Sequence, residues 1–285
     1  MKYQRSSNPV PPMEWKDYIK RANRGWKDIL ESAPIDEAPI QHFLEENPSL
    51  IPGAYGISFS SGHAPIYGAV FSQPELPGFH SKKPDFMWIA TSSKGIYPIL
   101  IEIESLNKKW FRQDGQPTAE FTQAQNQMNQ WRIWFSNPVN QLQFREVYLK
   151  DFPFRDDIIT PHYVLICGRR KDLEPYRNTR SVLMKKDEEH MSYDRLSFSR
   201  DQSDYLTVKM KDDGVYAIKI PPISMISPDI MEYWSHIKNL PQFFLEEPDS
   251  DLSQERKEFL FERFKYGLEW FNSKDVKSHN IIDRE

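Results

Sequence analysis

The feature that most constrains the fold is a pair of apolar runs joined by a short turn, PDFMWIATSSKGIYPILIEIE, at residues 84–104. Two β-rich runs separated by a few turn residues predict a β-hairpin. The turn has Ser92 in its first and Gly95 in its last position, which favours a type I turn. Glu102 and Glu104 alternate with isoleucines near the end of the second run. Because side chains alternate along a strand, both carboxylates share one face, about 7 Å apart.

The register of this hairpin decides which carboxylates meet across the strands. If Ser93 is the first central turn residue, Asp85 lies opposite Glu102; if Lys94 is the first, Asp85 lies opposite Glu104. The two registers differ by two residues, so both keep the three carboxylates on one face. Facing carboxylates destabilise a sheet. A divalent cation such as Mg²⁺ would compensate, and so would simple exposure to solvent.

The remaining elements follow from periodicity and turn residues. Apolar spacings of three and four predict helices, and β-branched runs predict strands. The expected helices cover 14–31, 37–47, 121–135 and 253–272; the expected strands are one at 162–170 and a pair, YLTVKM and GVYAIKI, around Asp212-Asp213-Gly214. Short strands and long loops are expected at 52–84, and a polar, charged stretch at 171–204. This order predicts an α/β protein with a central mixed sheet flanked by helices.

The chain lacks a Gly/Ser linker, so one domain with helical additions is expected. The predicted divisions are an N-terminal arm and helix at 1–36, a core at 37–222 and a helical C-terminal extension at 223–285. The last helix carries an apolar stripe that could pack on the chain's own core or form an oligomer contact. Its members are Leu260, Phe264, Leu268 and Phe271.

Composition excludes several classes of protein. A chain of 285 residues with 39% hydrophobic and 14% aromatic residues is too apolar to be disordered. Its single cysteine, Cys167, excludes an internal disulfide and a thiolate zinc site, and a buried strand position favours a packing role. No run has signal-peptide or membrane-span character, so a cytoplasmic protein is expected. Walker and GxGxxG motifs are absent, which argues against a nucleotide cofactor. GxSxG and HExxH motifs are absent too, which argues against α/β-hydrolase chemistry and a zinc site.

The net charge of −4 excludes a globally basic surface. Binding to nucleic acid would therefore depend on local clusters, although a cluster of this kind taken alone is more often ordinary solvated surface. The clusters are Lys82 and Lys83, Lys108 with Lys109 and Arg112, and Arg169 with Arg170 and Lys171.

The hairpin carboxylates also suggest a family. Pro84-Asp85 followed by Glu102-Ile103-Glu104 resembles the PD-(D/E)xK nuclease pattern, with Glu104 where lysine is usual. More specifically, the chain resembles the Shedu anti-phage defence nucleases over about 37–200. The matching pieces are IQHFLEENPSLI, KPDF, IEIE, TAEFTQAQNQMNQWRIWF, VLICGRR and YDRL. Their order and spacing, and not any single piece, make the resemblance.

The resemblance implies a nuclease core that hydrolyses DNA with Mg²⁺ or Mn²⁺ and assembles into homo-oligomers, with a tetramer as one form. Carried onto this sequence, it makes Asp85, Glu102 and the Ile103 carbonyl the metal ligands. Glu37 would be an outer or second-metal carboxylate, and Gln127 would lie beside the site. The DNA contacts are expected from the basic residues near the hairpin. These are Lys82, Lys83, Lys108, Lys109 and Arg112.

Glu104 is the departure from the family pattern and leaves three possibilities open. Glu104 could act as the general base or hold a second metal ion. Alternatively, Lys108, Lys109 or Lys83 could supply the missing cation. In the third case activity is lost, and the chain is an inactive nuclease-fold module for DNA binding or scaffolding. The main prediction is a metal-dependent DNA endonuclease in anti-phage defence, with the inactive module as the alternative.

Overall fold

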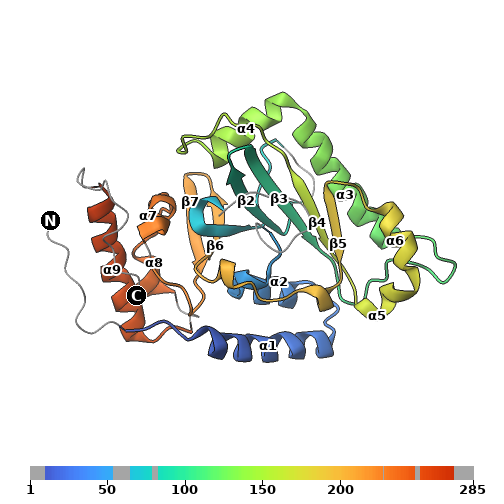
Figure 1. Ribbon diagram of the computed structural model, residues 1–285, viewed down its shortest axis with the longest axis horizontal. Helices are drawn as coiled ribbons and strands as arrows, with labels where there is room; N and C mark the ends of the chain where they lie inside the picture. The colour runs from blue at the N-terminus through green and yellow to red at the C-terminus, as the bar shows by residue number, and fades with distance from the viewer. Residues whose placement is uncertain (1–9, 54–64, 79–82, 227, 248–250, 273–285) are drawn as a thin grey trace.

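The computed structural model describes residues 10–53, 65–78, 83–226, 228–247 and 251–272 (Figure 1). At its centre is a mixed seven-stranded sheet with the strand order β5-β4-β3-β2-β1-β6-β7. The strands are β1 (Ala69–Ser72), β2 (Phe86–Ser92), β3 (Gly95–Ile103), β4 (His162–Ile166), β5 (Glu188–Met191), β6 (Leu206–Lys211) and β7 (Gly214–Lys219). The prediction of an α/β protein with a central mixed sheet is confirmed.

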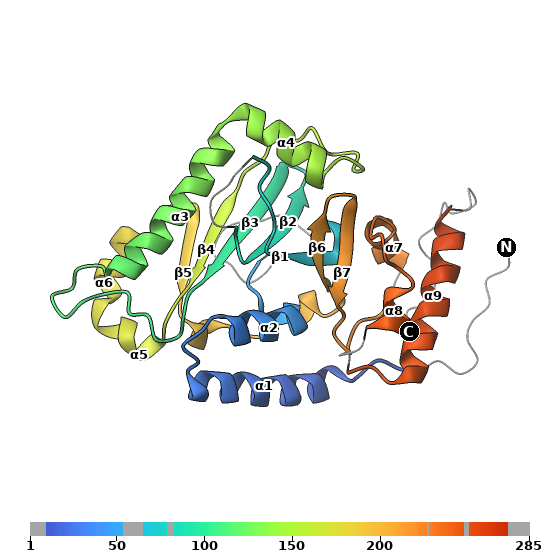
Figure 2. The same ribbon diagram turned by 180° about the vertical axis from the view of Figure 1, so that it is seen from behind.

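Helices cover both sides of the sheet (Figures 1 and 2). They are α1 (Trp15–Ser32), α2 (Ala38–Glu46), α3 (Ala119–Ser136), α4 (Pro138–Tyr148), α5 (Arg170–Leu173), α6 (Arg177–Leu183), α7 (Pro228–Trp234), α8 (Phe243–Glu246) and α9 (Gln254–Asn272). α3 and α4 lie on one side, α1 and α2 on the other, and α7, α8 and α9 lie beyond β7. Among the described residues, no helix combines the length and the apolar character that crossing a membrane requires.

The hairpin adopts the first of the two predicted registers. Ser92 pairs with Gly95 and Phe86 pairs with Ile101, so the next position places Asp85 opposite Glu102. β3 also runs parallel to β4, and β4 runs parallel to β5. The carboxyl ends of these three strands therefore meet at one edge of the sheet, together with the start of β2. Ligand sites of α/β sheets commonly lie at such an edge.

Both faces of the hairpin are buried, which explains its nearly continuous apolar sequence. On one face, Met87 and Leu100 belong to the same apolar cluster as Met128 of α3. On the other face, Ile101 packs in a cluster with Leu44 of α2. By alternation, the positions of Asp85 and Glu102 continue the face that α3 covers.

Most expected elements agree with the structure to within a few residues. The helices expected at 14–31, 37–47 and 121–135 are α1, α2 and α3, and the Asp212-Asp213-Gly214 turn joins β6 to β7. The stretch 171–204 was expected only as polar and charged, yet it contains α5, α6 and β5. β5 has the sequence EEHM, whose acidic residues do not predict a buried strand. These acids are buried because ion pairs compensate their charges, and such pairs do not show in the apolar periodicity of the sequence.

The stripe of the C-terminal helix packs on the chain itself. Leu260 and Phe264 are fully buried, and the Phe264 ring lies 5.8 Å from that of Phe244. The backbone N–H of Arg256 donates to Ser253 Oγ over 3.2 Å, so Ser253 caps this helix. Of the two open alternatives, packing on the chain's own core is therefore the role of this stripe.

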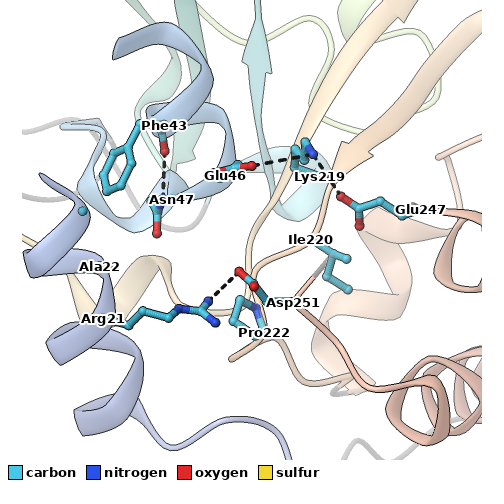
Figure 3. Close-up of a pocket in the computed structure, with 11 residues that line it drawn as sticks. Arg21, Ala22, Phe43, Glu46, Asn47, Lys219, Ile220, Pro222, Glu247 and Asp251 are labelled. Carbon is cyan, nitrogen blue, oxygen red and sulfur yellow. Dashed lines mark hydrogen bonds and ion pairs between the residues drawn. The ribbon is translucent and has the colours of Figure 1, made fainter. Parts of the chain in front are cut away.

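The N-terminal helix, the sheet and the C-terminal extension meet around a small cavity of about 160 Å³ (Figure 3). Lys219 of β7 lies 3.8 Å from a carboxylate oxygen of Glu46 and 3.7 Å from one of Glu247. Arg21 of α1 pairs with Asp251 over 2.7 Å. Burial raises the pKa of Glu247 to about 7, and the charges of Lys219 and of Lys257 offset only part of that shift.

Glu247→Gln should therefore stabilise the protein at high pH. The glutamate pKa is 4.5 in the unfolded chain and higher in the folded one, so its charge costs stability as the pH rises through these values. Glutamine resembles the neutral acid, and we expect a gain on the order of 1 kcal/mol at pH 8.5 and almost none at pH 4.5. Thermal unfolding at both pH values tests this, with the exposed Glu269→Gln as control. Equal effects at the two pH values would contradict it.

Candidate active site

The backbone of β3 holds the carboxylate of Asp85 in place. The Ile103 N–H donates to Asp85 Oδ2 over 2.8 Å, and the Asp85 N–H donates to the Ile101 carbonyl over 3.0 Å. Burial raises the pKa of Asp85 to about 7, partly opposed by the Ile103 hydrogen bond. The nearby charges of Glu37 and Glu104 raise this pKa further. Asp85 is thus fixed in position among other acids.

Glu102 lies next to Asp85, and a hydrogen bond between the two side chains lowers the Asp85 pKa. Glu102 is buried, with only 4% of its surface exposed. Gln127 of α3 is also buried, among the apolar residues with which α3 packs on the same side of the sheet. Its Nε2 has no hydrogen-bond partner among the described residues. A free amide donor is therefore available on the side of the sheet where Asp85 and Glu102 lie.

Lys108 joins the other two acids of the site. Its Nζ lies 3.1 Å from Glu37 Oε1 and forms a close ion pair with Glu104 Oε2. Partial burial alone would lower the pKa of Lys108, but the hydrogen bonds and charges of Glu104 and Glu37 raise it overall. The Ser105 N–H also donates to Glu37 Oε1, over 3.1 Å. One of the three lysines considered as a replacement cation thus lies in the acidic site.

The segment that carries Lys108 is held by the residues that follow β4. Gly168 has φ of +62°, and a Cβ there would lie 2.6 Å from the Lys108 carbonyl oxygen, so only glycine allows this close approach. The Trp110 indole N–H donates to the Cys167 carbonyl over 2.7 Å. Burial raises the pKa of the Cys167 thiol to about 12, which agrees with the predicted packing role.

The residues expected to contact DNA occupy different surroundings. Lys108 is half-buried and ion-paired within the acidic site, so its ammonium group is not part of an open surface. Lys83 is exposed but ion-paired with a glutamate. Lys109 and Arg112 are exposed on the loop between β3 and α3. Lys82 lies outside the described residues.

Asp85, Glu102 and the Ile103 carbonyl provide oxygen donors of the kind that Mg²⁺ and Mn²⁺ prefer. In the part of the chain that the structure describes, no group of three or more His, Cys, Asp and Glu side chains is arranged to hold a metal ion. Mg²⁺ is usually bound by only one or two carboxylates and keeps several waters. A buried pair of neighbouring carboxylates therefore fits a hard divalent cation, and the crowded charge around Asp85 agrees with this.

Two contacts of the site were not predicted from the sequence. The Tyr193 hydroxyl donates to the Glu104 carbonyl over 2.7 Å, and the Ser105 N–H binds Glu37. Asp194, next to Tyr193, binds Arg169 through Nε and Nη2 at 2.8–3.1 Å. The YDRL segment at residues 193–196 could have indicated these contacts, because it is one of the pieces that carry the family resemblance. The resemblance assigned no role to it.

Comparisons with known proteins agree with these observations. A search of curated proteins found no significant match. The family model of the C-terminal part of the Shedu protein SduA matches residues 35–197, which is more than half of the chain. The match begins just before Glu37, ends just after the YDRL segment and includes every residue of the acidic site. The chain therefore belongs to the Shedu family.

Proposed function

We propose that this protein is a metal-dependent DNA endonuclease that acts in anti-phage defence. Membership in the Shedu family links the chain to anti-phage defence. The observation that carries the nuclease proposal is the pairing of Asp85 with Glu102 at the carboxyl edge of the sheet, with Lys108 close by. Two adjacent carboxylates can hold a divalent metal ion, and a cation beside them can stabilise the negative charge that develops on a phosphate.

In the proposed mechanism, the side chains of Asp85 and Glu102 and the carbonyl of Ile103 would hold Mg²⁺ or Mn²⁺. When bound, such an ion would polarise the phosphate and lower the pKa of a water. The Ile103 N–H fixes Oδ2 of Asp85, and the side chains of Asp85 and Glu102 lie within hydrogen-bonding contact of each other, so both could face one ion. Gln127, with an unused amide donor, would orient a water or a phosphate oxygen.

Lys108 takes the part that the motif lysine has in related nucleases. Glu104 and Glu37 keep its ammonium group protonated, because their negative charges raise its pKa. A protonated Nζ can donate hydrogen bonds to the attacking water or to the negative charge that develops on the phosphate. Glu104 is then a positioning residue for Lys108, although it occupies the usual place of the lysine.

The inactive nuclease-fold module is the second candidate. It is favoured by one observation, the two ion pairs that hold Lys108 away from any substrate unless they rearrange. A direct comparison separates the two candidates, because an active enzyme cleaves DNA with Mg²⁺ or Mn²⁺ and an inactive module only binds it. Assembly into homo-oligomers, including tetramers, is a further prediction that a mass measurement in solution would check.

The first functional prediction is that Asp85→Asn abolishes cleavage and stabilises the protein. The amide keeps the shape but removes a ligand charge, so we expect activity to fall by at least roughly 100-fold. It also removes repulsion from the neighbouring acids, and thermal unfolding without metal should show a gain on the order of 1 kcal/mol above pH 7. The gain should vanish near pH 4, because the pKa of Asp85 rises from 3.8 in the unfolded chain to about 7 in the folded protein.

The exposed Asp28→Asn is the matched control and should change neither cleavage nor stability. Full metal-dependent cleavage by Asp85→Asn would remove this carboxylate from the mechanism. Glu102→Gln should likewise abolish cleavage, because Glu102 is the second carboxylate of the pair.

The second functional prediction tests the role of Lys108. Lys108→Met keeps the aliphatic stem and removes the charge, so cleavage should fall by about 10²–10⁴-fold, the usual range for a lost proton donor or acceptor. DNA affinity should change less than about threefold, because a single charge contributes little to binding. Lys109→Met is the control, since its side chain is exposed and lies outside the ion pairs. If both variants cleave DNA like the wild type, Lys108 does not replace the motif lysine.

A further inference from the structure

A cavity of about 360 Å³ lies between α5, α6 and the segment after β5. Arginine is the most frequent residue in its wall, and the wall contains a single carboxylate. The lining residues are Arg170, Leu173, Glu174, Arg177, Arg180, Ser192 and Arg195. We call this cavity the arginine pocket. α5 and the segment after β5, which contribute to its wall, lie at the edge of the sheet where β4 and β5 end (Figure 1).

Within the described part of the chain, the guanidinium groups of two of these arginines form an ion pair or hydrogen bond with another residue and those of the other two form neither. Arg195 forms an ion pair with the buried Glu189, and Arg170 Nη2 donates to the Asp194 carbonyl over 3.1 Å. Within the described residues, Arg177 and Arg180 form no ion pair. Burial lowers the pKa of Arg180, and the charges of Arg195 and Arg177 lower it further. The pocket therefore has an excess of positive charge that the protein itself does not neutralise.

Phosphate is the anion that suits this pocket best. The guanidinium group presents several N–H donors in a fixed plane, and this plane matches two phosphate oxygens at once. A volume of about 360 Å³ admits a phosphate group together with its sugar. The whole chain has a net charge of −4, so attraction of a polyanion must come from local concentrations of charge such as this one.

The arginine pocket and the acidic site share structural supports. The Arg180 guanidinium lies over the Trp110 ring, 5.9 Å from its centre, and Trp110 follows the Lys108 segment. Ser192 lines the pocket, and the next residue, Tyr193, donates its hydroxyl hydrogen to the Glu104 carbonyl. Both sites thus lie at the carboxyl edge of the same strands, where one DNA strand can contact both.

We propose that the arginine pocket binds a backbone phosphate of the DNA strand that the acidic site cleaves. This inference rests on the proposed function. It adds a second contact point for the cleaved strand, outside the acidic site. Arg177 and Arg180 supply the N–H donors, since neither guanidinium group forms an ion pair among the described residues. Arg170 and Arg195, fixed by Asp194 and Glu189, line the pocket beside them.

The test compares the double variant Arg177→Gln/Arg180→Gln with Lys20→Gln/Arg24→Gln. Both remove two positive charges, but Lys20 and Arg24 lie exposed on α1, outside the pocket. Fluorescence anisotropy of a labelled DNA duplex, with EDTA to prevent cleavage, gives the affinity at several salt concentrations. We expect the pocket variant to bind at least about tenfold more weakly. The plot of log K against log salt should also become less steep, its slope falling in magnitude by about 1–2. Equal losses in both variants would overturn the proposal.

Two further measurements keep the outcome clear. Arg177 is exposed, so Arg177→Gln alone should fold normally and reproduce about half of the slope change if the double variant is unstable. Inorganic phosphate and AMP, added up to millimolar concentrations, test for a free ligand. If either raises the melting temperature of the wild type but not of the pocket variant, while DNA affinity is equal in both proteins, the pocket serves a free phosphate compound and the proposal is wrong.

Failure of this inference can be distinguished from failure of the proposed function. If the wild type binds DNA through the arginine pocket but cleaves nothing with Mg²⁺ or Mn²⁺, the phosphate-binding role of the pocket stands and the proposed nuclease activity is wrong. If the wild type cleaves DNA and Arg177→Gln/Arg180→Gln leaves the DNA affinity and KM unchanged, the nuclease proposal stands and the role of the arginine pocket is wrong. A wild type that does not bind DNA at all overturns the inference.

Discussion

Repulsion among carboxylates at one edge of the sheet is the constraint on which the rest of the site depends. Four acids gather there, and the charges of Glu37 and Glu104 act on Asp85. Asp85 precedes β2, Glu102 and Glu104 lie at the end of β3 and directly after it, and Glu37 directly precedes α2. Such crowding destabilises a fold unless protons, cations or hydrogen-bond donors compensate it. Here the protein provides an N–H donor to Asp85 and an ammonium group between Glu37 and Glu104.

The surrounding fold keeps these groups in place. β3 is buried on both faces, so the strand that carries the acids has little freedom to move. The Lys108 segment is anchored by Trp110 and by close contact with Gly168, and Tyr193 holds the backbone at Glu104. A site that stores repulsion needs rigid supports of this kind, since otherwise the chain would relax by separating the charges.

Opposite charges lie close to each other along this edge of the sheet. The acidic site suits a divalent cation, and the arginine pocket suits an anion. In the proposed function, a divalent ion at the acidic site would act on the scissile phosphate and the arginines would hold a neighbouring one. Local charge of this kind is what a protein with a net charge of −4 would need to attract a polyanion.

The amino-acid sequence by itself determined the hairpin, the face of its carboxylates and the helices with a clear apolar period. It did so because these features depend on neighbours close in the chain, such as Ser92 and Gly95 at the turn. The sequence also determined the family, because the order of its short segments between residues 35 and 197 matches the family model. The register was open in the sequence, and only the paired strands selected Glu102 as the partner of Asp85.

The tertiary structure alone decided what depends on contacts between distant segments. The sequence allowed Lys108 to be a DNA contact, a replacement cation or ordinary surface, and only the tertiary structure places its ammonium group between Glu37 and Glu104. The sequence did not predict β5, because its buried acidic residues are compensated by ion pairs with Arg132 of α3 and with Arg195, which apolar periodicity does not reveal. Charge and burial are properties of a three-dimensional neighbourhood, so a one-dimensional pattern does not reveal where they balance.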